Sequence, residues 1–476
     1  MKTQRAPTLS KSLSPVHVVA LSLGSIIGWM AFVMPGTDFL PKAGPLGVSL
    51  AFGVASLAMI LIALNYGYMV NRHPVAGGEF SFASFAFGKY HAFFCAWFLI
   101  LSYLMPVMLN AVAISHVLRT LFPSIIEIGP HYSVAGYDVT IVQLAISWLS
   151  LLVFASLCTR GVDSTGFFQT VLVLALVGSV GVMTGALATH SAAWGSMRPA
   201  LPSHGDVLVG FLHVLAVAPC AFVGFDTVPQ GVEEFAFPYR RTKWIMIASI
   251  IAGMLIYIAL ALLASSSAPA EYGSWEAYAE ALPNETGLRA LPAFHAAYEL
   301  LGGTGFAFLT YAAVAAVLSG ILGFFMAASR LLFSIARAGV LPPWFARIHQ
   351  TTQTPRNAIL FIMCVSLVAT LFGRTALGWL VDLCSLGAAI AYGYTSAATF
   401  MYARGEGDRR HMATGVVGTI LAILFVVLIL VPIPAIGCSM SHEGYICFIA
   451  WSGLGLLFLF AARPREEKNG INQELQ

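Results

Sequence analysis

The chain has 476 residues, of which 58% are hydrophobic and only 9% are charged. Soluble proteins carry about a quarter of charged residues, so this composition and a mean hydropathy of +0.83 exclude a soluble enzyme, a disordered chain and a secreted disulfide scaffold. The net charge of +3, without a basic stripe between aromatic residues, argues against a nucleic-acid partner and leaves the lipid bilayer as the principal surroundings.

Apolar runs follow one another along most of the chain. A helix needs about 20 mainly apolar residues to span a bilayer, and twelve runs meet this requirement. The sequence therefore predicts an all-α integral membrane protein with twelve transmembrane helices. They are expected at residues 16–40, 46–70, 89–118, 139–158, 166–188, 206–235, 243–265, 304–335, 357–373, 376–402, 412–433 and 445–462.

The basic residues predict the orientation of these spans. With the N-terminus inside, the inner segments carry 19 Lys and Arg residues and the outer segments carry 5. Cytoplasmic loops are the ones enriched in Lys and Arg. We therefore expect a multi-pass protein of the plasma (inner) membrane, with cytoplasmic tails at 1–15 and 463–476.

Two of the expected spans are interrupted. The first contains Gly24-Ser-Ile-Ile-Gly28 followed by Pro35, and the sixth contains Gly224 between Pro219 and Pro229. Gly24-x-x-x-Gly28 alone is also typical of close helix packing. A matching interruption five spans later favours a functional interpretation, because broken helices in corresponding halves mark the binding site of many carriers. An offset of five spans predicts two inverted five-helix repeats, 16–200 and 201–405, with helices 11 and 12 in 406–462.

Such interruptions have a simple chemistry. Unwinding leaves backbone N–H groups free at the start of one half-helix and carbonyl groups free at the end of another. The N–H end favours an anion and the carbonyl end favours a cation. A zwitterion can therefore be held without any charged side chain.

Several motifs, taken in order and spacing, resemble the amino acid–polyamine–organocation transporters over residues 15–405. The resemblance implies a secondary transporter with a 5+5 inverted-repeat (LeuT-like) core, broken helices 1 and 6, and two peripheral helices. It implies an amino acid or related amine as the small-molecule substrate. The motifs are Gly24–Gly28 with Pro35-Gly36, His73-Pro-Val-Ala-Gly-Gly-Glu79-Phe, Ala221–Asp226 with Glu233-Glu234 and Pro238, Ser329-Arg330, Ala336–Pro342 and Thr354–Asn357.

The resemblance also implies a substrate site at both interruptions. The backbone of Ser25, Ile26, Ile27 and Gly28 is expected to meet a carboxylate, and the carbonyls of Phe222 and Val223 an amino group. Cys220 corresponds to a position where some members carry a bulky lid, and a small residue there leaves room for the substrate. Gly224 lies at the second interruption, and Phe225 beside it is either a hydrophobic gate or a packing residue.

Two departures from the family pattern keep alternatives open. The span 1 motif continues with Trp29-Met30 instead of a small residue and a glycine. Trp29 either lines the site and attracts a cation through its ring or packs against a neighbouring helix, so a carrier of decarboxylated amines or polyamines is the alternative to an amino acid carrier. Span 5 lacks the lysine of some proton-coupled members.

The coupling ion is therefore open between H+ and Na+. Asp226 either takes up a proton or caps the second half of the broken helix, and Ser319 either joins a sodium site or packs within its helix. No metal ligand set, cofactor motif or catalytic cluster is present in the sequence, so an enzyme is only a remote alternative. Glu233, Glu234, Arg240, Arg241 and Lys243 either form ion pairs that close the inner end, or the basic residues only anchor it on the cytoplasmic side, which leaves the two glutamates unexplained. Cys438 and Cys447 are either paired or free.

Overall fold

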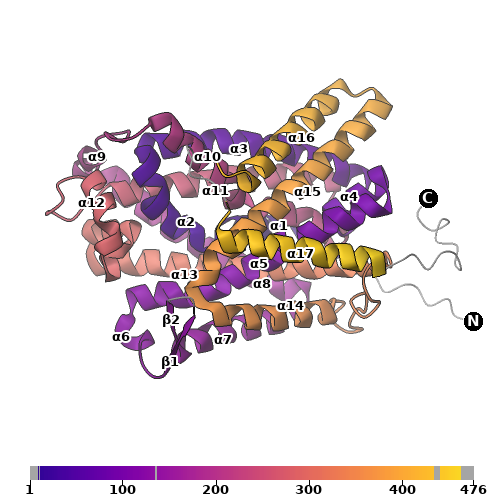
Figure 1. Ribbon diagram of the computed structural model, residues 1–476, viewed down its shortest axis with the longest axis horizontal. Helices are drawn as coiled ribbons and strands as arrows, with labels where there is room; N and C mark the ends of the chain where they lie inside the picture. The colour runs from indigo at the N-terminus through magenta and orange to yellow at the C-terminus, as the bar shows by residue number, and fades with distance from the viewer. Residues whose placement is uncertain (1–8, 10, 135–136, 434–439, 462–476) are drawn as a thin grey trace, which may run out of the picture.

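The computed structural model describes residues 9, 11–134, 137–433 and 440–461 (Figure 1). The predicted C-terminal tail, most of the N-terminal tail and Cys438 lie outside the described residues, so the question of a Cys438–Cys447 pair stays open. Within the described part, eleven helical segments are long and apolar enough to cross a membrane.

These segments follow the expected runs closely. The first includes a short helix, α2 (Trp29–Met34), the π-helical turn η1 (Pro35–Phe39) and α3. The long helices are α3 (Leu40–Arg72), α5 (Lys89–Leu121), α7 (Ile141–Thr159), α8 (Val162–Thr189), α10 (Val207–Phe222), α11 (Thr242–Ser265), α13 (Pro292–Arg337), α14 (Arg356–Ala369), α15 (Ala376–Glu406), α16 (Arg409–Leu430) and α17 (His442–Ala461).

Shorter elements complete the two broken spans or connect the long helices. The sequence prediction did not include the small antiparallel hairpin or helix α4 between two spans. The helical ones are α1 (Pro15–Ile26), α4 (Gly78–Phe87), α6 (Pro123–Ile126), α9 (Ser191–Ser196), α12 (Trp275–Ala281) and the short helices η2 (Phe225–Glu234), η3 (Tyr239–Arg241), η4 (Leu282–Asn284), η5 (Gly287–Ala290) and η6 (Thr370–Thr375). The hairpin pairs β1 (His131–Val134) with β2 (Tyr137–Thr140).

Local sequence explains where several helices begin. Ser14, Thr140, Asp206 and Asp408 each precede a helix, and each side chain accepts hydrogen bonds from amides of its first turn. Such caps satisfy N–H groups that have no partner inside the helix. The expected spans 1 and 2 meet at a kink at Gly44, which lies between their predicted bounds and whose φ of +67° is a left-handed value that glycine adopts without strain.

The helices from α1 to α15 pack against one another. Helix α1 lies against α8, α11, α13 and η2, while α5 packs between α13 and α15. Helix α16 borders these helices at α15 and α3, and α17 touches α15 and α5; α16 lies at one edge of the molecule in Figure 1, opposite α7 and α14. Large apolar side chains such as Leu149, Leu174 and Leu457 point outward and are more than half exposed. An exposed apolar belt on helices whose backbone groups are internally bonded is what a bilayer requires, so this is a multi-pass membrane protein.

Candidate functional site

The two interruptions predicted from the sequence lie against each other. Helix α1 ends at Ile26 and α2 begins at Trp29, while α10 ends at Phe222 and η2 begins at Phe225. Gly224 has a φ of +136°, and a Cβ added there would lie 2.5 Å from the Ile26 amide nitrogen. Only glycine combines this backbone conformation with so close an approach, so Gly224 holds the two breaks in contact.

The break in span 1 leaves one amide free. The Trp29 amide donates to Asn110 Oδ1 over 3.3 Å, and Asn110 Nδ2 donates to the Pro106 carbonyl over 2.9 Å. A Cβ on Gly28 would lie 2.9 Å from the same Asn110 oxygen, so glycine makes room for this side chain. Among the described residues, no acceptor lies within hydrogen-bonding distance of the Gly28 N–H.

The break in span 6 leaves a carbonyl free. The Val223 amide donates back to the Cys220 carbonyl over 3.2 Å. The amide and the hydroxyl of Thr227 both donate to the Gly224 carbonyl. The Val223 carbonyl between them has no donor within the described part of the chain. A free donor on one break and a free acceptor on the other are the two groups that a zwitterion needs.

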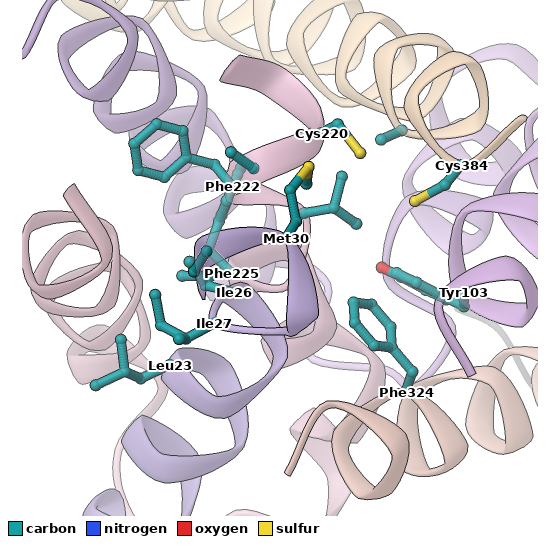
Figure 2. Close-up of a cluster of buried hydrophobic side chains, with 14 of the residues drawn as sticks. Leu23, Ile26, Ile27, Met30, Tyr103, Cys220, Phe222, Phe225, Phe324 and Cys384 are labelled. Atoms are coloured by element: carbon teal, nitrogen blue, oxygen red, sulfur yellow. The ribbon is translucent and has the colours of Figure 1, made fainter. Parts of the chain in front are cut away.

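Gly28 and Val223 both line one small cavity of about 30 Å³. Figure 2 shows Met30, Cys220, Cys384 and Phe324 around this space, from helices α2, α10, α15 and α13. None of the lining residues is charged. They are Ser25, Ile26, Gly28, Trp29, Met30, Pro106, Leu109, Asn110, Cys220, Val223, Tyr257, Phe324 and Cys384.

The structure thus brings six of the ten predicted substrate residues to the cavity wall: Ser25, Ile26, Gly28, Trp29, Cys220 and Val223. The other four lie behind it. Ile27 is fully buried, Gly224 fills the contact between the breaks, and the Phe222 ring packs on Phe52 with 6.0 Å between centroids.

Phe225, the fourth, lies in an aromatic cluster. Its ring stacks on Tyr392 at 5.4 Å and meets the edge of Tyr66 at 5.6 Å. Trp29, in contrast, lines the cavity, and its buried indole N–H has no protein acceptor. Its polar edge is therefore free for a ligand.

Comparison with known proteins identifies the family. A family model described as amino acid permease matches residues 13–454. The chain belongs to the amino acid permease family. It is therefore a member of a transporter family rather than an enzyme.

Three relatives show the range within this family. Cationic amino acid transporter 3, mitochondrial, of Arabidopsis thaliana is 25% identical over 81% of this chain, and the match spans 61% of that relative's length. The methylthioribose transporter of Bacillus subtilis (strain 168) is 25% identical, over 83% of this chain and 82% of the relative. The branched-chain amino acid permease BcaP of Lactococcus lactis subsp. cremoris (strain MG1363) is 26% identical, over 83% of each chain.

The two predicted coupling residues of the permease are both buried. Asp226 Oδ1 accepts from the Gly224 amide over 2.7 Å, while Oδ2 is buried without a partner. Asp226 therefore binds the backbone at the break, and the choice between its two expected roles stays open. The Ser319 hydroxyl lies 3.1 Å from the Gly24 carbonyl and 2.9 Å from the Ala316 carbonyl.

The sequence analysis did not single out Gln169, which contacts Ser319. Gln169 on α8 points at span 1, and its Nε2 donates to the carbonyls of Ala20 and Ser319, 3.2 Å away in each case. A Cβ on Gly24 would lie 2.2 Å from this nitrogen, which explains the first glycine of the span 1 motif. An amide that does not titrate thus bridges spans 1 and 8.

A larger hollow of about 330 Å³ has Asp38, Lys42 and His213 on its wall. Asp38 bonds Lys42 Nζ over 2.7 Å and His213 Nε2 over 3.0 Å. We call this side the Asp38 end.

The opposite side, the Glu234 end, is closed by ion pairs. Glu234 holds the buried Arg330 through two hydrogen bonds of 2.9 and 3.2 Å, and Glu233 holds Arg337 at 2.6 Å. The expectation that the two glutamates pair with nearby Arg240, Arg241 or Lys243 is wrong. The acids of η2 reach instead to α13, and the main chain of Leu13 bonds the Glu234 carbonyl over 2.9 Å.

Proposed function

We propose that this permease carries an amino acid with an uncharged, mainly apolar side chain across the membrane by alternating access. In this proposal the twelve expected spans form two inverted five-helix repeats and two peripheral helices. The observation that carries it is the pair of free backbone groups at the breaks, the Gly28 N–H and the Val223 C=O. The first would bind the carboxylate and the second the amino group.

The same observation favours an amino acid over an amine that lacks the carboxylate. Trp29 and Met30, which depart from the family pattern, still leave a donor for a carboxylate. The Trp29 amide donates to Asn110, while the Gly28 amide stays free. An amine would leave this buried N–H without an acceptor, which costs about 1–3 kcal/mol. A carrier of decarboxylated amines would instead rely on the ring face of Trp29.

The wall of the cavity supports an uncharged side chain. It has no acidic group to neutralise a cationic substrate, and an unpaired charge in such surroundings is strongly disfavoured. This property agrees with the name of the branched-chain amino acid permease among the relatives and not with the names of the cationic transporters.

Alternating access is supported by the difference between the two ends. The cavity of about 30 Å³ holds no more than a water molecule or two, so it must widen for an amino acid to bind. The 330 Å³ hollow offers entry from the Asp38 end, while ion pairs seal the Glu234 end. The distribution of Lys and Arg supports placing the Asp38 end outside and the Glu234 end in the cytoplasm, across the plasma (inner) membrane.

For the coupling ion we propose H+, with Asp226 as a participant. Sodium at Ser319 is the alternative, and it would have to displace the Gln169 amide from the Ala20 and Ser319 carbonyls. A carboxylate with an unpartnered, buried oxygen is the better candidate for a reversible proton.

A thermal-shift measurement tests the substrate class. The purified protein in detergent is heated with L-leucine, with its decarboxylated amine 3-methylbutylamine, or with L-lysine. A ligand that binds only the folded state stabilises it by about 2.7 kcal/mol at a hundredfold excess over Kd. We expect L-leucine to raise the melting temperature and the other two compounds to leave it unchanged. Stabilisation by the amine alone would contradict the proposed carboxylate site.

A further inference from the structure

A second buried carboxylate lies behind the cavity. Glu79 is at the start of α4, between two spanning helices, and its side chain is fully buried. Its Oε1 accepts from the Tyr66 hydroxyl over 2.8 Å, and its Oε2 accepts from Gln230 Nε2 over 2.6 Å. Among the described residues, no Lys, Arg or His nitrogen lies within 4.0 Å of it. A buried carboxylate without a cation is strongly disfavoured in its ionised form.

Tyr103 joins Glu79 to the broken helix. The Tyr103 hydroxyl points from α5 toward the broken helices (Figure 2) and lies 2.8 Å from the main-chain carbonyl of Asp226. It also lies 3.2 Å from Glu79 Oε1 and 3.3 Å from Gln230 Nε2. The Tyr103 hydroxyl therefore has two acceptors in reach, the Asp226 carbonyl and Glu79 Oε1, and it links Glu79 to the broken helix.

Asp226 adds a second reason for a proton on Glu79. Its carboxyl group is fully buried, with one oxygen on the Gly224 amide and the other without a partner. Two carboxylates in one buried region do not both ionise readily, because each charge disfavours the other. Burial, together with the charge of Asp226, raises the pKa of Glu79 well above its usual range.

The other groups around Glu79 do not neutralise it. The groups on which its charge acts are hydroxyl and thiol groups, contributed by α3, α5 and α15: Tyr66, Tyr103, Cys95 and Tyr392. The arginines of α13 are engaged by Glu234 and Glu233. Two histidines near α4 pack on its far rings, His73 on Phe85 and His91 on Phe87.

We propose that Glu79 and Asp226 together hold one exchangeable proton, which this permease moves with its substrate, and that Glu79 carries it in the closed state. Tyr103 links Glu79 to Asp226, and Asp226 binds the backbone at the break directly beside the Val223 carbonyl. Opening of the break therefore changes the surroundings of both acids. The proton arrives from water on one side, bonds to a carboxylate oxygen and returns to water on the other. This inference rests on the proposed function, because it requires a transported substrate.

The test uses the full-length protein in liposomes with labelled L-leucine. Exchange of internal and external leucine at equal pH is measured first, since its absence in the wild type would contradict the proposed function and not the proton site. A pH gradient of one unit, with the membrane potential clamped, is then imposed. With one proton per substrate, the wild type is expected to accumulate leucine up to about tenfold and to carry protons that an internal pH dye detects.

Glu79→Gln is neutral at every pH, and its amide is close in shape to the protonated acid. We expect it to keep exchange at equal pH, since Glu79 lies outside the cavity, and to lose both the gradient-driven accumulation and the proton signal. Glu299→Gln is the matched control on an exposed glutamate of α13 and is expected to behave as the wild type. Leucine exchange without proton movement in the wild type, or full accumulation by Glu79→Gln, would overturn the proposal.

Tyr103→Phe supplies a readout that does not depend on the folding of Glu79→Gln. The Tyr103 hydroxyl donates to Glu79, which favours the ionised acid, so its removal favours the protonated form. We expect the pH of half-maximal gradient-driven uptake to rise in this variant. A pH profile identical to that of the wild type would overturn the role assigned to this contact.

Discussion

Replacing Gly28 with alanine keeps the proposed N–H donor and adds a methyl group beside the carboxylate contact. The added Cβ would lie 2.9 Å from Asn110 Oδ1 and 3.6 Å from its Cγ, so the Asn110 side chain must move and its 3.3 Å bond with the Trp29 amide is lost. Both Gly28 and Asn110 line the cavity of about 30 Å³, and the methyl group takes much of that space. Overpacking of this kind costs about 1–3 kcal/mol of stability.

The effect on binding is separate from the effect on stability. A hydrogen bond to a charged group contributes about 1.5–3 kcal/mol, which is about 10- to 150-fold in affinity. We expect Gly28→Ala to raise the KM for leucine exchange in liposomes by a factor in this range. Gly53→Ala on α3 is the matched control, because a Cβ there meets no atom within 4 Å, and its KM should equal that of the wild type. A folded Gly28→Ala protein with an unchanged KM would refute the role of the Gly28 amide.

Three further predictions concern the second break, the closed end and the cavity. Gly224→Ala forces a side chain onto a φ of +136° and against span 1, so we expect a lower melting temperature, and an unchanged one would contradict the close contact. Glu234→Gln removes the carboxylate that pairs with Arg330, whose side chain is only 2% exposed, so we expect the free energy of unfolding to fall by about 3–5 kcal/mol. Adding Arg330→Met should recover most of this loss. A double variant without recovery would exclude the ion pair as the cause. A small methanethiosulfonate reagent should react with Cys220 and inactivate leucine exchange, and leucine added beforehand should protect the protein. The Cys220→Ser variant should resist the reagent, whereas Cys364→Ser, at an exposed cysteine, should stay sensitive. Equal inactivation of both variants would place the reactive thiol elsewhere.

The sequence was sufficient to predict the membrane class, the approximate spans and the position of both breaks. These features depend on local composition, and Gly28 and Gly224 mark the breaks without any knowledge of their neighbours. The partners of these glycines were not predictable in the same way. Asn110 follows Gly28 by some eighty residues, and Gln169 approaches Gly24 from another helix, so both depend on how distant helices pack.

The errors at the Glu234 end have the same origin. Arg240, Arg241 and Lys243 are close in sequence to the glutamates, but the end of η2 turns the acids toward α13, where Arg330 and Arg337 project. Glu79 appeared in the sequence only as part of a family motif. Its burial and its contact with Tyr103 arise because α4 folds back against α5 and η2.

Competition for labelled leucine uptake tests the central claim most directly. The competitors are unlabelled L-leucine, its amine 3-methylbutylamine, its deaminated acid 4-methylpentanoate and L-lysine, at equal concentrations in liposomes that contain the wild-type protein. A site formed by the Gly28 N–H and the Val223 C=O requires both charged ends and an uncharged side chain, so only L-leucine should compete strongly. Equal competition by 3-methylbutylamine would show that the carboxylate is not recognised and would contradict the account.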